Sequence, residues 1–183
     1  MLGEKVNSMT DETELKAVIN VKNEQIKIPA DNFVLILARL LKILNNDISR
    51  SKKRDTAYIW SEVGYMELGC GEIGMFLIPG EIFPELYNGE FLPAAESANG
   101  TEAHYKVLEA QSDAKHTFVV GLCNDELGYI IPDNDFLLNE GLPYINGAKD
   151  RFGRNHYEET NSTGRHTARK ILEETDRLIL SVK

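Results

Sequence analysis

The sequence predicts a mixed α/β fold, with a mixed sheet covered by helices, and three observations carry this prediction. Two β-prone segments, 57–68 and 72–78, are separated by the turn residues Gly69-Cys70-Gly71. A third apolar segment, 116–123, has the pattern of a buried strand. Apolar side chains recur at helical spacing over 167–182, which is typical of an amphipathic helix packed on a sheet.

The N-terminal segment is expected to hold a flexible end and a hairpin. Residues 1–14 are polar and predict a flexible N-terminus. Two short β-prone runs follow at 17–21 and 25–28, and the residues 22–24 between them predict a turn. Pro29 ends the second run.

The segment that follows is unusually apolar. Asp31 or Asn32 can cap a helix, and residues 33–44 are large and apolar at nearly every position. A helix that is apolar on most faces is buried against more than one partner. We therefore expect a helix at 32–45 that covers the sheet and is itself covered by much surrounding protein.

The remaining segments alternate short elements with loops. The pattern predicts a loop at 45–55, a short helix at 81–87, a loop at 88–103, a short helix or strand at 105–111, a short strand at 128–131 and a loop at 133–165. The last loop has about 30 residues, and loops beyond about 15 are uncommon unless they carry function.

Composition narrows the classes of partner. The chain has 183 residues and a formal charge of −9, from 20 Lys and Arg against 29 Asp and Glu. This length fits one domain or one piece of a larger one. The acid excess argues against nucleic acid, whose phosphates need a dense basic patch; the one basic run, at 50–54, predicts a solvated loop. Two cysteines are too few for a disulfide framework or a cysteine-type zinc site.

The sequence contains no apparent membrane span or export signal. Its longest apolar stretch, 33–44, is interrupted by Arg39 and Lys42 and is shorter than the ~20 residues that a span needs. The polar N-terminus lacks the apolar core of a signal peptide. The cellular compartment therefore stays open.

The strongest local signal for chemistry is the segment 77–81, LIPGE. A buried strand ends at Pro79-Gly80, and the carboxylate of Glu81 follows at the start of a predicted helix. Reactive groups in α/β folds lie at the carboxyl ends of strands, and a helix dipole stabilises an anion at its N-terminus. The alternative is that Glu81 only favours the helix N-terminus.

Polar residues also follow a second predicted strand, in the segment 121–129, GLCNDELGY. Asn124-Asp125 is explained either as part of a site or as a plain turn. Cys123 would be a nucleophile only as an activated thiolate beside a histidine. Because no histidine is placed to support that role, a buried apolar cysteine is the simpler interpretation.

A third segment, 155–167, gathers two His, two Glu and several Ser and Thr before the last helix. His156 and His166 are ten residues apart, and the chain has no H-x-x-x-H pair. Local histidines alone therefore do not predict a metal site. Ser162 or Thr163 is explained more simply as a helix N-cap.

These three segments, in this order and spacing, resemble the neutral/alkaline non-lysosomal ceramidase family and its bacterial relatives. Family members have a strand ending in Pro-Gly-Glu, a Gly-Leu-x-Asn strand leading to a His-Tyr or Gly-Tyr pair, and a Tyr-Glu-x-x-Ser/Thr segment before a closing helix. No single string is diagnostic, but four in order are fairly specific. The resemblance covers about 60–180 and rests on 60–68 (WSEVGYMEL), 76–86 (FLIPGEIFPEL), 119–132 (VVGLCNDELGYIIP) and 156–167 (HYEETNSTGRHT).

The resemblance implies a zinc-dependent amidase, in which a zinc-bound water attacks the N-acyl bond of a sphingolipid and releases a fatty acid and an amine base. In the family, two His, one Glu and one Tyr hold the zinc. By resemblance Glu81 takes the glutamate position and Tyr129 the tyrosine position. Asn124, Tyr157 and Glu158 fall in the matching strings and are expected to line the site. Such a site lowers the pKa of bound water to about 7.

The sequence departs from the family's motifs in two places, and both change the function that we expect. The family's histidine ligands lie in an N-terminal half, in His-x-His and Ser-His-Pro motifs, and none of the four histidines here has such a setting. The family's Arg-Gly-Asp motif with its serine has no match either. At 82–86 this chain has IFPEL in place of a Thr-Thr and Gly-Arg-Arg run, which favours a divergent bacterial relative acting on an N-acyl amide or lipid-like substrate.

We therefore expect 15–183 to be the C-terminal portion of a larger hydrolase fold, with the missing N-terminal half as its partner. In one reading the chain contributes Glu81 and Tyr129 to a zinc site completed elsewhere, and is inactive alone. In the other it is a non-catalytic binding or structural domain that kept the fold and lost the metal-binding histidines. The sheet is expected to continue into the missing half, so the isolated chain would expose an edge and form a homo-oligomer through it.

Overall fold

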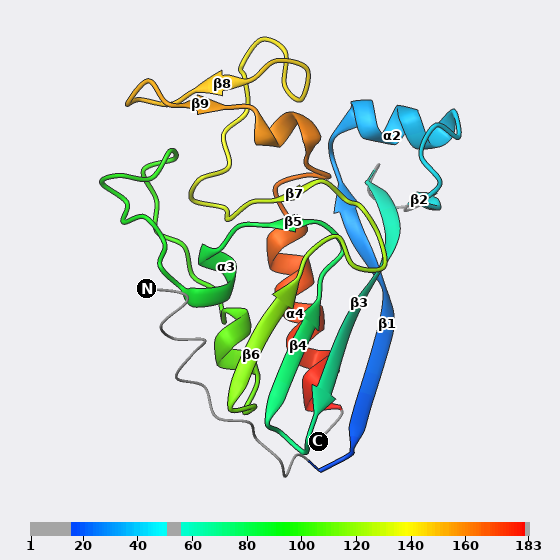
Figure 1. Ribbon diagram of the computed structural model, residues 1–183. Helices are drawn as coiled ribbons and strands as arrows, with labels where there is room; N and C mark the ends of the chain where they lie inside the picture. The colour runs from blue at the N-terminus through cyan, green and yellow to red at the C-terminus, as the bar shows by residue number, and fades with distance from the viewer. Residues whose placement is uncertain (1–15, 51–55, 182–183) are drawn as a thin grey trace, which may run out of the picture.

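A mixed sheet forms the centre of the fold (Figure 1). The computed structural model describes residues 16–50 and 56–181. The strands follow the order β1-β3-β4-β6, and β2 pairs with the first three residues of β3. Their bounds are β1 (Ile19–Ala30), β2 (Ile48–Arg50), β3 (Ala57–Leu68), β4 (Ile73–Leu77) and β6 (His116–Val120). Strands β4 and β6 are parallel and the other pairs antiparallel, which confirms the predicted mixed α/β class.

The predicted N-terminal hairpin is wrong, because β1 is a single twelve-residue strand. It pairs with β3 along its whole length, from Ile19 opposite Leu68 to Ala30 opposite Ala57. This long ladder satisfies more backbone groups than a local turn at 22–24 would. Pro29 does not end the strand either, because β1 lies at the sheet edge, where a missing N–H is tolerated.

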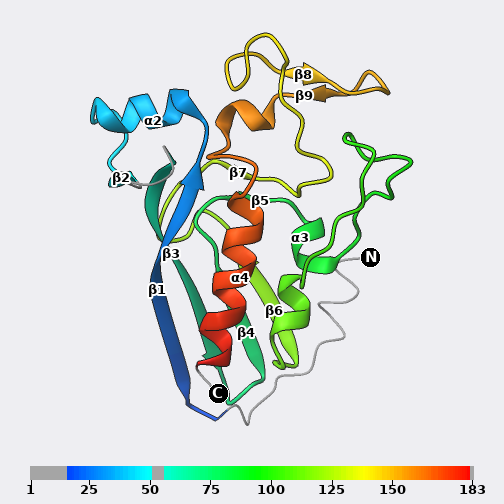
Figure 2. The ribbon, with the colours of Figure 1, turned by 180° about the vertical axis from the view of Figure 1, so that it is seen from behind.

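The predicted C-terminal helix is confirmed as α4 (Thr167–Leu180), which covers one face of the sheet. It lies behind the sheet in Figure 1 and in front of it in Figure 2. Its apolar side packs against buried strand residues such as Ile28, Ile59 and Phe76. The buried helix positions are Thr167, Ala168, Ile171, Leu172, Glu174, Thr175, Leu178 and Ile179. Val182, the last predicted position, lies outside the described residues, as do residues 1–14.

The predicted helix at 32–45 is shorter, and its burial was predicted wrongly. Helix α2 (Phe33–Leu40) begins at the N-cap Asn32, whose side chain accepts hydrogen bonds from the backbone N–H groups of Val34 and Leu35. It ends just before Lys42, which has a left-handed backbone with φ of 57°. The helix lies beyond the end of the sheet rather than over it (Figure 1). Its exposed apolar residues, with those of the following turn, are Phe33, Val34, Leu37, Leu40, Leu41 and Ile43.

Strand β6 is confirmed in position, but the prediction that it is buried was wrong. It is the last strand of the sheet, and its exposure alternates. Phe118 is 54% exposed and Val120 40% exposed, whereas Thr117 and Val119 are half-buried. The alternation arises because only one face of the sheet at β6 is covered, next to α3 (Glu85–Asn88) and η1 (Leu108–Gln111).

The predicted helix at 81–87 is split into two elements. Residues Glu81–Ile82 form the short strand β5, and α3 begins only at Glu85. Strand β5 pairs in parallel with β7 (Tyr129–Ile130), which confirms the predicted short strand at 128–131. Pairing with β7 satisfies the backbone of β5, so Glu81 does not lie at a helix N-terminus.

The long segment after β7 is largely irregular, as predicted for 133–165. It contains the small antiparallel pair β8 (Ala148–Lys149) and β9 (Asn155–His156), then the turn η2 (Glu158–Asn161) that leads into α4. In the loop predicted at 45–55, the structure adds β2, and residues 51–55 lie outside the described part. None of the helices described combines the length and apolar character that crossing a membrane requires.

Candidate functional site

The two residues predicted to bind metal, Glu81 and Tyr129, lie side by side. They are register partners in the parallel pair of β5 and β7. The Glu81 backbone N–H donates to the carbonyl of Gly128 at 3.0 Å, and the Phe83 N–H donates to that of Ile130 at 3.1 Å. Because residues paired in register project side chains to the same side, the carboxylate and the phenol share one surface. Segments 48 residues apart in sequence thus meet beyond the end of β4.

Tyr157 completes a small polar group around Tyr129. The two rings meet edge to face, with centroids 6.1 Å apart and an interplanar angle of 86°. Hydrogen bonding to Tyr157 and the negative charge of Glu81 raise the pKa of Tyr129 to about 12. The phenol is therefore neutral at physiological pH unless a cation binds beside it.

A cavity of about 350 Å³ opens beside these three side chains. Leu35, Arg39 and Leu44, from α2 and the turn after it, form one wall, and Leu127 lies in another. Glu126 and Asn161 add polar groups. The cavity therefore combines two carboxylates, two phenols and one guanidinium with the apolar side chains of three leucines.

Arg39 is the one cationic residue in the lining of this cavity, and the motif analysis missed it. It is only 5% exposed; its Nη1 donates to the carbonyl of Leu35 at 3.3 Å, while its Nε has no hydrogen-bond partner. Burial lowers the pKa of Arg39, and the charge of Asp125 opposes that shift. The only signal in the sequence was that Arg39 interrupts an apolar run. Such an interruption does not show which cavity the arginine lines.

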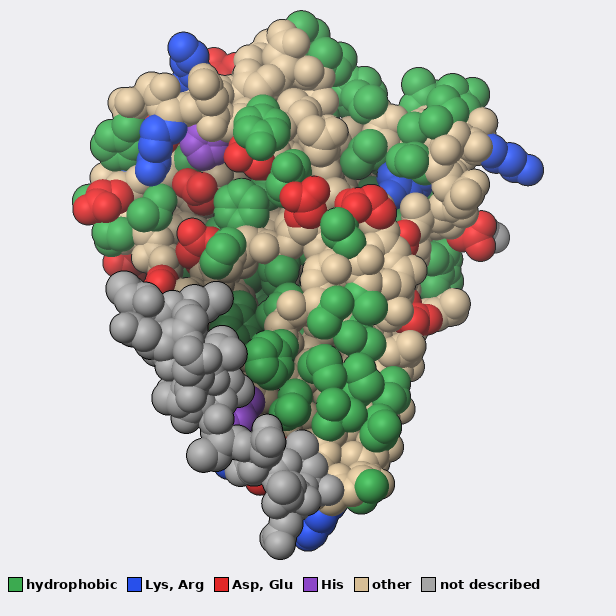
Figure 3. All heavy atoms as spheres, viewed as in Figure 1, with side chains coloured by type: hydrophobic (Ala, Val, Ile, Leu, Met, Phe, Trp, Pro, Cys, Tyr) green, Lys and Arg blue, Asp and Glu red, His purple; other side chains and the backbone are tan. Residues whose placement is uncertain are grey.

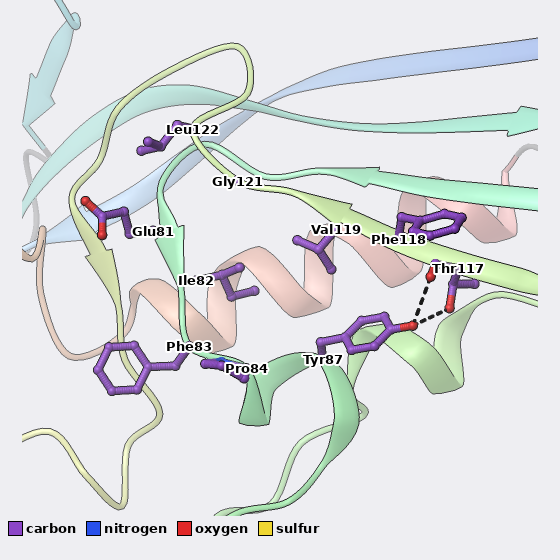
Figure 4. A pocket seen from close by; sticks show the side chains of 10 residues that line it. All are labelled: Glu81, Ile82, Phe83, Pro84, Tyr87, Thr117, Phe118, Val119, Gly121 and Leu122. Atoms are coloured by element: carbon purple, nitrogen blue, oxygen red, sulfur yellow. Dashed lines mark hydrogen bonds between the residues drawn. The ribbon is translucent and has the colours of Figure 1, made fainter. Parts of the chain in front are cut away.

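A second, larger groove of about 600 Å³ also begins at Glu81 (Figure 4). Its walls are mainly apolar and include Ile82, Phe83 and Val119. At the far end the Tyr87 hydroxyl hydrogen-bonds to the Thr117 side chain at 2.6 Å and donates to the Thr117 carbonyl at 3.1 Å. Glu81 is thus shared between a polar cavity and an apolar groove.

The other predicted site residues lie differently. Asn124 is exposed, has a left-handed backbone with φ of 70°, and lines neither the cavity nor the groove. The plain-turn interpretation describes this loop better, because Asp125 accepts a hydrogen bond from Ser61 at 2.7 Å and ties the loop to β3. Glu158 lines a separate cavity of about 130 Å³, and its carboxylate accepts from the Tyr157 backbone N–H.

The prediction that Cys123 is a buried apolar cysteine is wrong. Cys70 is exposed at the turn between β3 and β4, and Cys123 is half-buried. The Cys123 thiol donates weakly to the Asn124 side chain at 3.6 Å. Both cysteines lie in turns, where the covering side chains of a strand interior are missing.

The segment that carries Tyr157 is anchored by a buried cluster of charges. His156 Nδ1 lies 3.2 Å from Glu159 Oε1, and His156 Nε2 lies 3.6 Å from Asp150 Oδ2. Glu159 also accepts from the backbone N–H of Leu137 at 2.8 Å, while its second oxygen has no partner. Asp150 is bound by Arg154 Nε at 2.6 Å. This cluster fixes β9 and η2 on either side of Tyr157.

The donors around Glu81 suit part of a metal site. A carboxylate and a phenol are oxygen donors that zinc accepts, although it usually takes four ligands. In the described part of the chain, no group of three or more His, Cys, Asp or Glu side chains could hold a metal ion. Glu81 and Tyr129 therefore supply two oxygen donors at one place, short of the four ligands that zinc usually takes.

Comparison of the chain with protein-family models, with curated proteins and with solved structures gave no match. The functional conclusion therefore depends on the geometry of the site and on the four sequence strings.

Proposed function

We propose that this chain is the C-terminal part of a zinc-dependent amidohydrolase that resembles the neutral ceramidases, and that a second polypeptide segment completes its metal site. The observation that carries the proposal is the register pairing of Glu81 with Tyr129. The two positions were assigned from motifs alone, and unrelated motifs have no reason to meet in adjacent strands.

The roles of the residues follow from their positions. Glu81 and Tyr129 would hold the zinc, which when bound supplies a water with a pKa near 7 for attack on an amide carbonyl. Tyr157 contacts Tyr129 and fixes the orientation of its ring. The apolar groove beside Glu81 offers a binding surface for the apolar part of an N-acyl amide.

Two features support a site that is shared with other polypeptide. The described residues supply oxygen donors but no histidine around Glu81 and Tyr129. Helix α2, which forms a wall of the same cavity, exposes apolar side chains that include Phe33 at 49% and Leu37 at 53%. Apolar surface next to an incomplete site is expected where another segment packs.

Zinc affinity of the purified chain tests the proposal, measured by competition with a chromophoric chelator. We expect weak binding that Glu81→Gln weakens about tenfold or more, because a neutral amide is a poor zinc ligand. Glu126→Gln is the matched control, because it removes a carboxylate from the same cavity but outside the β5–β7 pair. It should change the affinity less than about twofold, well under the ~1.4 kcal/mol of a tenfold effect.

Equal effects of the two substitutions, or no effect of either, would remove Glu81 from the metal site. Amidase activity is the second readout. The purified chain alone should have none, and activity without any partner would contradict the shared site.

The alternative is a non-catalytic binding domain, and the groove favours it as the second candidate. The groove is large and mostly apolar and needs no metal to bind an apolar ligand. Binding of a long-chain amide that survives both Glu81→Gln and a chelator would support this reading over the first.

A further inference from the structure

Arg39 places a buried positive charge in the lining of the cavity that also contains Glu81 and Tyr129. Its Nη1 donates to the backbone carbonyl of Leu35, in the same helix, at 3.3 Å. Within residues 16–50 and 56–181 this is the one hydrogen bond of the guanidinium, although each of its nitrogens carries N–H donors. Most donors of Arg39 are therefore left unused by the described part of the chain.

The nearest influence on this charge is Asp125, which does not pair with it. The charge of Asp125 acts on Arg39 through space. Its carboxylate already accepts hydrogen bonds from Ser61, at 2.7 Å, and from Asn46, and no ion pair between described residues joins it to Arg39. A buried charge without a hydrogen-bonded counter-ion is costly. An anion that enters the cavity would supply that counter-ion.

The two carboxylates of the cavity leave room for such an anion, because they face water. Glu81 and Glu126 are both exposed, and acidic side chains are visible across the middle of this face of the molecule in Figure 3. Glu126 also accepts a hydrogen bond from the Gly128 backbone N–H at 2.8 Å. Water screens exposed charges strongly, whereas a buried charge acts strongly at short range. A ligand anion seated against Arg39 therefore gains more from that contact than it loses to the exposed carboxylates.

The cavity suits a carboxylate better than other anions. A planar guanidinium forms two parallel hydrogen bonds with a carboxylate. A phosphate group would bring about two negative charges to a cavity that already has two carboxylates, whereas a carboxylate brings one. The volume of about 350 Å³ holds a small organic group, and Leu35, Leu44 and Leu127 can contact its carbon atoms.

The cavity and the apolar groove meet at Glu81, which lines both. In the proposed function, Glu81 lies beside the amide bond that is cleaved. An amide bound there can extend its acyl chain along the groove, past Ile82 and Phe83 (Figure 4), and its amine part into the cavity with Arg39. Acyl chain, amide and carboxylate follow one another in this order in an N-acyl amino acid.

We propose that Arg39 binds the carboxylate of an N-acyl amino acid, and that this class of compound is the substrate of the site. The second part rests on the proposed function, whereas the carboxylate contact has a test of its own. Hydrolysis breaks the amide C–N bond: the hydroxyl of the water joins the acyl carbon, and a proton joins the nitrogen. The products are a fatty acid and a free amino acid, and no further reactant is consumed.

Calorimetric titration of the purified full chain with two matched ligands, in the presence of zinc chloride, tests the carboxylate contact. N-decanoylglycine and N-decanoylethanolamine share the acyl chain and the amide, and they differ in a carboxylate against a hydroxymethyl group. We expect the glycine compound to bind about tenfold more tightly, because only its carboxylate pairs with a buried charge.

Arg39→Gln should reduce this preference to less than about twofold, because it removes the charge but leaves Glu81 and Tyr129 in place. The variant thus separates a carboxylate held by Arg39 from one held by zinc. Arg39→Lys should retain part of the preference, because lysine keeps the charge but lacks the planar fork. Lys42→Gln is the matched control, since Lys42 is exposed in the turn after α2 and lines neither the cavity nor the groove. It should leave the preference unchanged, and circular dichroism checks that each variant folds.

Equal affinity of the wild type for the two ligands, or no binding of either, would overturn the proposal without any variant. A preference that survives Arg39→Gln, or that Lys42→Gln reduces equally, would overturn it as well. The zinc affinity of Glu81→Gln is a separate result. A glycine preference that depends on Arg39, together with a zinc affinity that Glu81→Gln leaves unchanged, would support the carboxylate contact and reject the zinc site.

Discussion

At the scale of single residues, the buried charges around His156 are the least ordinary feature of the chain. Asp150 and Glu159 flank the same imidazole, yet their environments act in opposite directions. Burial opposes ionisation of Asp150, but hydrogen bonds from Arg154 and from backbone N–H groups outweigh it and lower its pKa to about 2. Burial raises the pKa of Glu159, against the hydrogen bond from the Leu137 N–H and the proximity of His156.

The contributions of the two carboxyl groups to the free energy of unfolding should therefore change with pH in opposite directions. The lowered pKa of Asp150 contributes stability above the unfolded value of about 3.9, and this is lost as the pH falls toward about 2. Asp150→Asn should thus cost most at neutral pH and progressively less in acid. The raised pKa of Glu159 favours the fold below the unfolded value of about 4.3, and this is lost as the pH rises through the folded value.

Glu159→Gln should consequently gain stability relative to the wild type as the pH rises from about 4 to 8. Urea denaturation of both variants over a pH series measures these differences. Parallel pH profiles for the two variants would show that the cluster does not act as described.

At the scale of elements, the hydrophobic pattern of the sequence correctly predicted the strands and helices that have one covered side and one exposed side. The alternation in β3 and the helical spacing in α4 were sufficient, since each has one covered side. The pattern failed for β1 and β5 because partners distant in sequence decide their structure. Residues 22–24 pair with β3 instead of forming the predicted turn. Residue 81 pairs with β7 instead of beginning the predicted helix.

Some residues of the candidate site could likewise be predicted from the sequence, and others could not. The order of motifs led to Glu81 and Tyr129, and the structure brings these two together. Arg39 and the walls of the groove could not be found from the sequence, because they join segments that only the fold brings into contact. Asn124 was named from a motif position, but it lies in a left-handed turn and lines neither the cavity nor the groove.

The approach of η2 to β7 depends on Gly128, whose backbone has a φ of 81°. A Cβ at this position would lie 1.6 Å from the carbonyl oxygen of Asn161. Gly128→Ala should therefore destabilise the fold by about 3 kcal/mol and move η2, with Tyr157, away from Tyr129.

Gly71→Ala is the matched control for this prediction. It also has a positive φ, of 91°, but a Cβ there meets nothing within 4 Å. It should cost only about 1 kcal/mol of backbone strain. Urea denaturation compares the two, and equal losses would show that the contact with Asn161 does not hold the site together.

At the scale of the whole molecule, the chain has one well-packed core and one element that exposes apolar side chains. Helix α4 and the strands beneath it form one apolar core. The outer side of α2, in contrast, exposes apolar side chains that include Phe33 and Leu37. Exposed apolar surface of this kind is expected where another polypeptide packs, as the proposed shared metal site requires.

A crystal of this chain soaked with zinc chloride tests whether zinc binds between Glu81 and Tyr129. Anomalous diffraction at the zinc edge should show a peak between the Glu81 carboxylate and the Tyr129 hydroxyl, at about 2.0–2.2 Å from the carboxylate oxygen. Glu81→Gln crystals should lose that peak. Zinc bound only at exposed histidines such as His104 or His166, with nothing between Glu81 and Tyr129, would show that this pair does not bind zinc.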